Sequence, residues 1–238
     1  MNFGVILAGG IGSRMGNVEK PKQYMLLAKR PIIIHTIEKF LISNQFEKII
    51  VLCPEQWVVY TKNLIEKYIG KMSSIVVIEG GSTRNETIMN SIKYIDEHYG
   101  VDDDTIIVTH DAVRPFVTHR IIEDNVKAAE QYGACDTVVQ ATDTIVYSQD
   151  NTSITEIPDR SKVYQGQTPQ SFKAKKLREL YESLTDEEKN ILTDAAKIFS
   201  IRGEKVHLVK GEVYNTKITY PYDLKVAETM INGCEEEC

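Results

Sequence analysis

The sequence predicts an α/β fold, a doubly wound and mostly parallel sheet, because two patterns alternate along its 238 residues. Short runs rich in β-branched residues, typical of buried strands, alternate with longer segments whose apolar residues recur at helical spacing. Right-handed crossovers then place helices on both faces of one sheet. We expect a single Rossmann-like domain over residues 1–238, since we find no linker, repeat or low-complexity segment.

The individual elements follow from the same two patterns. The expected strands are short β-branched runs at 3–8, 48–53, 75–79, 105–109, 137–141 and 206–210. The expected helices have apolar residues three or four positions apart, at 31–42, 55–69, 86–99, 119–132, 174–184 and 186–200, with a last helix after Pro221. Gly133 is expected to end the helix before it, and Thr185 with Glu188 has the spacing of a capping box.

Residues 145–157 interrupt this alternation. Two β-branched runs, Thr-Ile-Val-Tyr and Ser-Ile-Thr-Glu-Ile, flank the turn-like Ser-Gln-Asp-Asn-Thr, which predicts a β-hairpin. We expect a hairpin arm over about 144–160 that projects from the sheet. Because an isolated hairpin is only marginally stable, the arm is expected to pack against a second subunit, which predicts a homodimer.

Composition excludes several classes of function. Lys and Arg number 28 against 34 Asp and Glu, and the net charge of −6 has the wrong sign for a general nucleic-acid or anionic-membrane surface. The four cysteines form no CxxC pair, so neither a disulfide framework nor a zinc site is predicted. The amino terminus has no basic region, and its apolar run is too short to span a bilayer. We expect a cytoplasmic protein that binds neither nucleic acid nor membrane.

A glycine-rich loop directly after the first expected strand is the strongest signal of a functional site. The run LAGGIGSRM, residues 7–15, precedes KPKQ at 20–23. Glycines at 9, 10 and 12 let backbone N–H groups approach a polyphosphate, and Arg14 and Lys22 add positive charge. The register fails the dinucleotide pattern G-x-G-x-x-G and lacks the Gly-Lys-Ser/Thr ending of a P-loop. A different phosphate-binding loop is therefore predicted.

This loop, LAGGIGSRMG followed by PKQ, resembles the nucleotidyltransferase signature of the sugar-phosphate cytidylyltransferases. Further motifs of that family follow in order along the chain: GGSTR at 80–84, HDAVRP at 110–115, DTI at 143–145, QTPQ at 167–170 and KIT at 217–219. The resemblance implies a Rossmann-like nucleotidyltransferase sheet and transfer of a cytidylyl group from CTP to a polyol phosphate. It also implies Mg²⁺ bound to the triphosphate and release of pyrophosphate.

The resemblance assigns roles to individual residues. The catalytic cations are Arg14 and Lys22 for the triphosphate and Lys217 for the α-phosphate. The CTP-binding residues are Leu7, Ala8, Gly9, Gly10, Gly12, Gly80, Gly81, Ser82, Thr87 and Asp111. Asp111 is also the one expected protein ligand of Mg²⁺, which is held mainly by the CTP phosphates. The sugar-phosphate residues are Thr144, Arg160 and Thr168.

Simpler roles stay open for several of these residues. Asp111 suits a helix or turn cap, with Arg114 as its ion-pair partner. Arg84 is equally suited to bracing its loop. Arg160, between charged neighbours, suits a solvated charge cluster, and an isolated lysine such as Lys217 is most often solvated surface.

Two departures from the family motifs distinguish its branches. Val146 follows DTI where the methylerythritol-phosphate cytidylyltransferases of isoprenoid synthesis commonly carry a basic residue, and Val113 replaces their usual alanine. Both features resemble the ribitol-5-phosphate cytidylyltransferases of teichoic-acid and capsule synthesis, which form CDP-ribitol for the cell wall. We therefore expect D-ribitol 5-phosphate as the acceptor, with 2-C-methyl-D-erythritol 4-phosphate as the alternative. If the arm is exchanged in a dimer, Thr144 and Arg160 would complete the neighbouring subunit's site.

Overall fold

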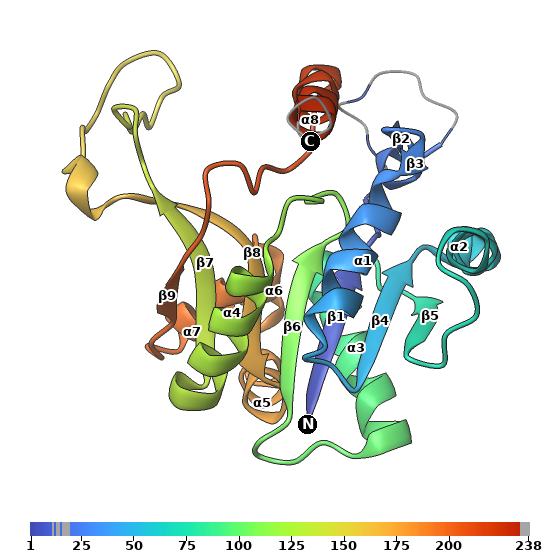
Figure 1. The fold of residues 1–238 in the computed structure, drawn as a ribbon. Coiled ribbons are helices and arrows are strands. Elements are labelled where there is room, and N and C mark those ends of the chain that lie inside the picture. Colours follow the sequence, from blue (N-terminus) through green and yellow to red (C-terminus); the bar gives the residue numbers. More distant parts are fainter. Residues whose placement is uncertain (11, 13–14, 16–19, 234–238) are drawn as a thin grey trace.

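A seven-stranded sheet in the order β5-β4-β1-β6-β8-β7-β9 forms the centre of the protein (Figure 1). The structure is a computed structural model of the 238-residue chain and describes residues 1–10, 12, 15 and 20–233. Its strands are β1 (Asn2–Leu7), β4 (Lys48–Cys53), β5 (Ile75–Glu79), β6 (Ile106–Asp111), β7 (Ala134–Gln140), β8 (Tyr164–Lys173) and β9 (His207–Lys210). A separate ribbon pairs β2 (Leu26–Leu27) with β3 (Arg30–Pro31).

The sheet is mostly parallel, which confirms the predicted fold class. β1 pairs in parallel with β4 and β6, β4 with β5, and β7 with β9. Only β8 runs the other way, between β6 and β7. All six expected strands are present, with ends that move by up to three residues.

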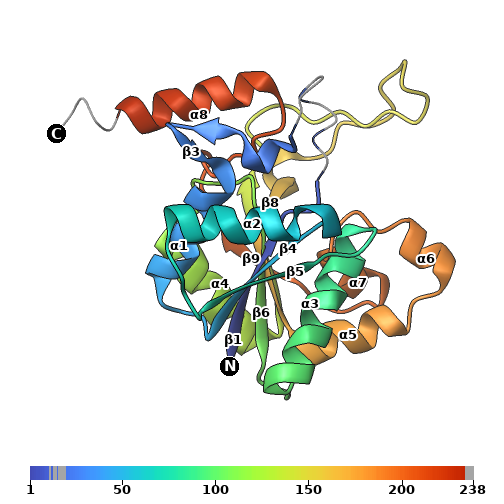
Figure 2. The ribbon, with the colours of Figure 1, turned by 90° about the vertical axis from the view of Figure 1, so that its right-hand side faces the viewer.

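Helices cover both faces of the sheet (Figures 1 and 2). Packed on one face are α1 (Ile32–Ser43), α2 (Glu55–Tyr68) and α4 (His119–Tyr132). On the other face are α3 (Arg84–Tyr99), α5 (Ala174–Glu182) and α7 (Ala196–Ile201). The side chains of Ile6 and Val108 enter the first core, whereas those of Val5 and Ile107 enter the second. The central strands are therefore apolar on both faces and read as continuous hydrophobic runs.

The expected caps are present, but the expected helix at 186–200 is wrong. Gly133 ends α4 in a left-handed conformation, and Thr185 and Glu188 form the capping box of α6 (Asp186–Asn190). The chain then leaves the helix and starts again as α7, where the carboxylate of Asp194 accepts the Lys197 backbone N–H at 3.0 Å. This local hydrogen bond competes with continued helix, which divides the segment into two short helices.

The last expected helix is α8 (Pro221–Gly233), which lies above the carboxyl ends of the parallel strands (Figure 1). In the part of the chain that the structure describes, no helix combines the length and the apolar character needed to cross a bilayer.

Strand β8 is the largest element that the sequence analysis missed. Its sequence, YQGQTPQSFK, is polar and contains glycine and proline, a pattern typical of a loop. Nevertheless, six consecutive residues of β8 are buried. Their polar side chains are bonded to neighbours: Ser171 donates to the Asn125 side chain at 3.0 Å, and Gln167 donates to the Glu212 carbonyl at 2.9 Å. Hydrogen bonding, rather than apolar character, makes this segment a central strand.

The segment at about 144–160 projects from the sheet as an arm, as expected (Figures 1 and 2). The predicted hairpin ladder is wrong, because a single bridge between Tyr147 and Glu156 is the pairing within this arm. Val146, Tyr147, Ile154 and Ile157 are each more than half exposed. A lone hairpin with no covered face cannot bury its apolar residues, which explains the loss of the ladder.

Candidate active site

A cleft of about 360 Å³ lies where the parallel strands β1 and β6 end. Its walls are the loop after β1, the loop between β5 and α3, and the segment before α8. Ligands of open α/β sheets bind at this edge. The predicted residues that line the cleft are Leu7, Ala8, Gly9, Gly10, Gly12, Lys22, Gly81, Ser82, Thr87, Asp111 and Lys217.

Among the described residues predicted for CTP binding and catalysis, Gly80 does not line the cleft; its backbone N–H donates to the Cys53 carbonyl at 2.9 Å and so holds the loop against β4. Arg14 lies outside the described residues.

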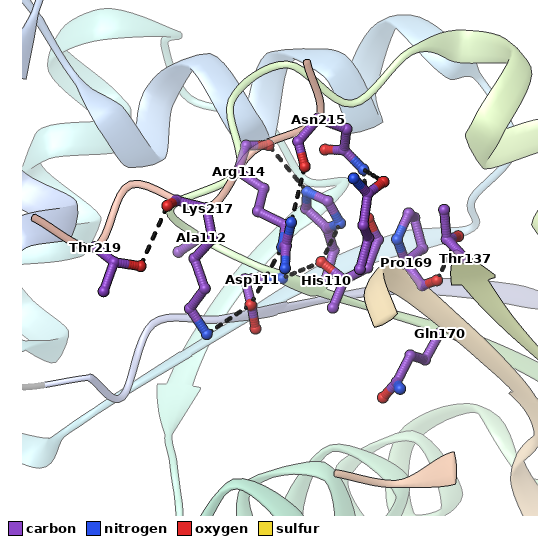
Figure 3. Close-up of polar contacts among 12 residues, drawn as sticks. His110, Asp111, Ala112, Arg114, Thr137, Pro169, Gln170, Asn215, Lys217 and Thr219 are labelled. Atoms are coloured by element: carbon purple, nitrogen blue, oxygen red, sulfur yellow. Dashed lines mark hydrogen bonds and ion pairs between the residues drawn. The ribbon is translucent and has the colours of Figure 1, made fainter. Parts of the chain in front are cut away.

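Asp111 lies at the centre of the cleft and contacts three cations, of which Figure 3 shows Arg114 and Lys217. Lys217 Nζ lies 2.9 Å from Oδ2, Arg114 Nε lies 3.5 Å from the same oxygen, and Arg84 forms an ion pair with Oδ1. Burial would raise the pKa of Asp111, but the charges of Arg84, Lys217 and Arg114 hold it well below its usual range. Asp111 is therefore an ionised anchor for cations rather than a helix cap.

The charge balance of the cleft favours an anionic ligand. The described residues of its lining include three cations, Lys22, Arg84 and Lys217, and one carboxylate, that of Asp111. The Lys22 side chain is buried, and Lys217 is 38% exposed. Cations held in a partly buried cleft interact strongly with phosphate oxygens. The local site is thus positive although the whole chain is acidic.

Lys217 is positioned by the extended segment that crosses the top of β8. Asn215, fully buried, donates from Nδ2 to the Thr168 carbonyl at 2.8 Å, and its own carbonyl accepts from Arg114 at 2.8 Å. On the other side of Lys217, the Ile218 N–H donates to Val113 at 3.0 Å, and the Ile218 side chain is fully buried. Lys217 is therefore fixed on both sides and is not solvated surface.

The loop after β5 is rigid because its polar groups bond to one another. Thr83 and Glu86 form the capping box of α3, and the Gly81 N–H donates to the Thr87 hydroxyl at 3.0 Å. Hydrogen bonds from the Ser82 hydroxyl and from the Thr83 and Ser82 backbone lower the pKa of Glu86. A Cβ on Gly81 would lie 2.5 Å from Cβ and 2.8 Å from the carbonyl carbon of Glu86. Only glycine fits there, so the backbone of this loop is preformed.

In the loop after β1, Gln23 bonds back to the end of the strand, and the backbone at Gly9 and Gly10 is uncrowded. Gln23 donates from Nε2 to the Ala8 carbonyl at 2.6 Å, which ties the short helix η2 (Lys22–Tyr24) to the end of β1. Apart from the chain neighbours, no atom of the described residues lies within 4 Å of where a Cβ would stand on Gly9 or Gly10. The backbone here can be approached closely by a ligand.

Buried His110 and Thr168 support Asp111 from behind. Burial lowers the pKa of His110 to about 4, so the ring is neutral near pH 7. Nε2 lies 3.0 Å from the Arg114 carbonyl and must donate, which leaves Nδ1 to accept from the Thr168 hydroxyl at 2.9 Å. The same hydroxyl accepts the Asp111 N–H at 3.2 Å. Thr168 thus lies in the floor of the site, and a contact between Thr168 and an acceptor stays a prediction.

Within one chain, Thr144 and Arg160 are not brought to the cleft. Both are exposed at the base of the arm, and Arg160 donates to the Thr142 carbonyl at 2.9 Å. Asp159 pairs with Lys162 at 3.9 Å rather than with Arg160. Their role in acceptor binding therefore stays a prediction that needs a second chain.

The cleft does not contain a ready-made metal cage. Within residues 1–10, 12, 15 and 20–233, no group of three or more His, Cys, Asp or Glu side chains is arranged to hold a metal. Asp111 is the one carboxylate in the described lining. This donor set fits Mg²⁺ only in the way that nucleotide enzymes commonly bind it, through one carboxylate, water and the phosphates of the substrate.

Sequence reasoning missed several residues of the site. Gln23, Asn215 and Gln167 hold its loops in place, while Asp136 and Gln170 lie beside it on β7 and β8. The available signal was weak: Gln167 and Gln170 belong to the motif QTPQ and Asn215 shortly precedes KIT, but neither motif suggests which strand these amides join.

Comparison with known proteins identifies the relatives of this chain. The family model described as IspD, 2-C-methyl-D-erythritol 4-phosphate cytidylyltransferase, matches residues 3–233. The 4-diphosphocytidyl-2C-methyl-D-erythritol synthase of Anaerococcus prevotii is 26% identical, with a TM-score of 0.78 over 97% of this chain and 96% of that one. The 2-C-methyl-D-erythritol 4-phosphate cytidylyltransferase of Francisella tularensis is 27% identical, with a TM-score of 0.77 over 95% and 97%.

Proposed function

The chain belongs to the 2-C-methyl-D-erythritol 4-phosphate cytidylyltransferase family, and we propose that it transfers the cytidylyl group of CTP to a polyol phosphate. A phosphate oxygen of the acceptor would attack the α-phosphorus. The bond from that phosphorus to the β-phosphate oxygen would break, which releases pyrophosphate and leaves a CDP-polyol. No covalent enzyme intermediate is required.

The observation that carries this proposal is a cleft in which Arg84 and Lys217 contact one buried carboxylate and Lys22 lines the same space. Phosphoryl-type transfer depends mostly on positioning and on fixed positive charge, because negative charge spreads over the oxygens around phosphorus. Lys217, locked beside Asp111, would stabilise the α-phosphate, and Lys22 would bind the pyrophosphate that leaves. The family resemblance assigns Arg14 to the same task.

Mg²⁺ would reach the site with the triphosphate. When bound, it would supply a Lewis acid that neutralises phosphate charge, and the one carboxylate in the described lining that could hold it belongs to Asp111. The triphosphate itself would rest on the open backbone of Gly9, Gly10 and Gly12, where N–H groups can approach its oxygens.

Cytosine would be recognised by the preformed loop at 80–82. Its N4 amino group would donate to a backbone carbonyl of this loop, because the N–H groups of Gly80, Gly81 and Ser82 already donate within the protein. Uracil would leave at least one such group unpaired, which costs free energy in a buried site. The rigid bracing of Gly81 and Ser82 supports this choice, because fixed partners discriminate better than mobile ones.

2-C-Methyl-D-erythritol 4-phosphate is the acceptor that the comparisons support. The family description and the relatives from Anaerococcus prevotii and Francisella tularensis all carry that substrate or its product in their names. On this assignment the product is a CDP-methylerythritol.

D-Ribitol 5-phosphate is a second candidate, supported by two residues of the sequence. Val146 lies on the arm, next to Thr144, and Val113 lines the cleft. Both depart from the pattern common to the methylerythritol branch. The product would then be CDP-ribitol, a precursor of cell-wall polymers.

The exposed arm supports a homodimer. Its apolar side chains lie largely in solvent, since each is more than half exposed: Val146, Tyr147, Ile154 and Ile157. Covering them with a second subunit would remove this surface from water and bring Thr144 and Arg160 toward a neighbouring cleft.

One assay tests the reaction and separates the two acceptors. Pyrophosphate release is measured with CTP, UTP, ATP or GTP, each with either acceptor and Mg²⁺, and with a reaction that lacks the protein as the blank. Release with CTP and methylerythritol phosphate supports the assignment from the relatives, and release with CTP and ribitol phosphate supports the second candidate. No release above the blank with any pair would overturn the proposed function.

A further inference from the structure

The short helix η2, which carries Lys22, consists of a single turn. Its backbone hydrogen bonds join near neighbours: the Tyr24 N–H donates to the Pro21 carbonyl, and the Met25 N–H donates to the Lys22 carbonyl, both at 3.0 Å. Such bonds shape the turn without fixing it in the protein. Because Lys22 lines the cleft, the contacts that anchor η2 to other elements bear directly on where this cation stands.

Gln23 supplies the first anchor. Its side chain is buried, and Nε2 donates to the Ala8 carbonyl at 2.6 Å. This bond ties the middle of η2 to the end of β1. A single point of attachment fixes the place of the turn but not the direction in which it faces.

Tyr24 supplies a second anchor, at the end of η2. Its hydroxyl lies 2.8 Å from Oγ1 of Thr61 on α2, and both side chains are buried. Thr61 donates its own proton to the Trp57 carbonyl at 2.8 Å, so Tyr24 is the donor to Thr61. Burial raises the pKa of Tyr24, and the hydroxyl therefore keeps its proton and remains a donor near neutral pH.

The ring of Tyr24 is held by the same helix. Its centroid lies 5.1 Å from that of Trp57 and 5.2 Å from that of Tyr60, in a tilted and an edge-on arrangement. Both geometries are favourable for aromatic pairs. Since α2 is 14 residues long and packs on the sheet through Leu64 and Ile65, Tyr24 fastens η2 to a rigid element.

We propose that Tyr24, through its hydrogen bond to Thr61, is a positioning residue that orients Lys22 toward the phosphates of CTP. The proposal rests on the proposed function. The two anchors, Gln23 on β1 and Tyr24 on α2, fix the direction of η2 as well as its place. Without the second anchor, Lys22 would stay at the cleft but would be displaced from the charge that develops on the leaving pyrophosphate. A displacement of about 1 Å can cost as much as 10² in rate.

Three substitutions test the hydrogen bond, and a fourth is the control. Tyr24→Phe removes the hydroxyl and keeps the ring, Thr61→Val removes the acceptor at nearly constant size, and Thr61→Ser keeps the acceptor. Tyr68→Phe, at the far end of α2, is the matched control. We expect kcat to fall about tenfold in Tyr24→Phe and Thr61→Val, with both KM values within about threefold of wild type. Thr61→Ser and the control should keep kcat within about twofold of wild type.

A double-mutant cycle separates positioning from stability. Tyr24→Phe is combined with Lys22→Ala, and kcat and the melting temperature are measured for wild type, both single variants and the double variant. If Tyr24 acts through Lys22, the loss of kcat disappears in the Lys22→Ala background, whereas any loss of melting temperature persists. Equal fractional losses of kcat in both backgrounds, or no loss in either, would overturn the proposal and leave the proposed function standing.

Pyrophosphate binding tests the proposal without an acceptor or turnover, and it decides the outcome if no nucleotide and acceptor react. Inorganic pyrophosphate with Mg²⁺ is titrated calorimetrically into the same four proteins. Binding that Tyr24→Phe weakens about threefold or more, but only when Lys22 is present, supports the proposal while the proposed function fails. Without turnover, unchanged affinity in Tyr24→Phe, or no binding by the wild type, would overturn both.

Discussion

Lys217 Nζ lies 2.9 Å from Oδ2 of Asp111, and this ion pair joins the segment before α8 to the end of β6. Lys217 is 38% exposed and Asp111 is 7% exposed, so the cation faces the cleft while the carboxylate is held in its floor. The lysine is in place before any ligand binds. Such prior placement of charge is what makes a cation effective on a transition state.

Lys217→Ala is expected to lower kcat by about 10²–10³, the cost of removing one preorganised charge from a transition state. The melting temperature should change little, because Arg84 and Arg114 still compensate the Asp111 carboxylate. Steady-state kinetics with circular dichroism would check both statements. Lys225→Ala, on the exposed side of α8, is the control. A Lys217 variant with wild-type kcat would remove this residue from the mechanism.

Lys22→Ala is expected to reduce turnover by two or more orders of magnitude while the fold stays intact, because the residue serves charge that develops in the transition state. The measurement is pyrophosphate release at saturating CTP, compared with Lys39→Ala on the exposed side of α1. Equal turnover in the two variants would contradict the role.

Two glycine substitutions are expected to impair the protein in different ways, one through CTP binding and the other through stability. Gly10→Ala places a methyl group where, chain neighbours aside, no atom of the described residues lies within 4 Å, so stability is expected to be kept, while the methyl group would block the triphosphate. Gly81→Ala forces a methyl group against the backbone of α3, so stability should fall by about 1–3 kcal/mol. Thermal melts and CTP titrations of both variants separate the two effects. A stable Gly10→Ala protein with normal CTP affinity would place the triphosphate elsewhere.

Arg160→Ala is expected to raise KM for the acceptor about tenfold and to leave KM for CTP unchanged, since a lost charged contact weakens only the phosphate that it binds. Mixing this variant with Lys22→Ala tests the exchange of arms. If sites are shared, mixed dimers contain one site with both residues intact, and activity returns in part. No recovery in a mixture shown to form mixed dimers would mean that each site is built from one chain.

The stability of the protein should depend on pH through Asp136. Its pKa is raised by burial to about 7, so the folded state keeps a proton that the unfolded chain releases near pH 4. The free energy of unfolding that this group contributes therefore falls as pH rises through that window. Asp136→Asn should melt about 2–4 °C or more above wild type at pH 8, with a difference that shrinks toward pH 4. A difference that does not vary with pH would contradict the raised pKa.

The sequence predicted the elements that obey one simple pattern. β4 and β5 match their expected bounds because both are short and β-branched, although β4 is almost fully buried and β5 is an edge strand with one buried residue. The cleft was predictable for a related reason: its glycines and lysines follow strands whose ends meet at one edge of the sheet. Local spacing also sufficed for the caps at Gly133 and Thr185.

Long-range hydrogen bonds account for most of what was missed. β8 is a strand because Thr109, Thr137 and Asn125 supply partners from distant parts of the chain. Asn215 and Gln170 matter for the same reason, and a sequence does not reveal which distant group will meet an amide. Arg160 and Thr144 illustrate a second limit, because their assigned role requires a chain other than their own.

The position of β8 has a consequence for how the protein is made. Its two neighbours, β6 and β7, both precede it, so a nascent chain that has left the ribosome only as far as residue 160 has an open edge on β6 and no partner for β7. An open edge can pair with another molecule and lead to aggregation. β6 and β7 are joined only after residue 173 emerges, and the floor behind Asp111 forms in the same step. Because the cleft also needs Lys217, a chain can become active only after that later residue has emerged.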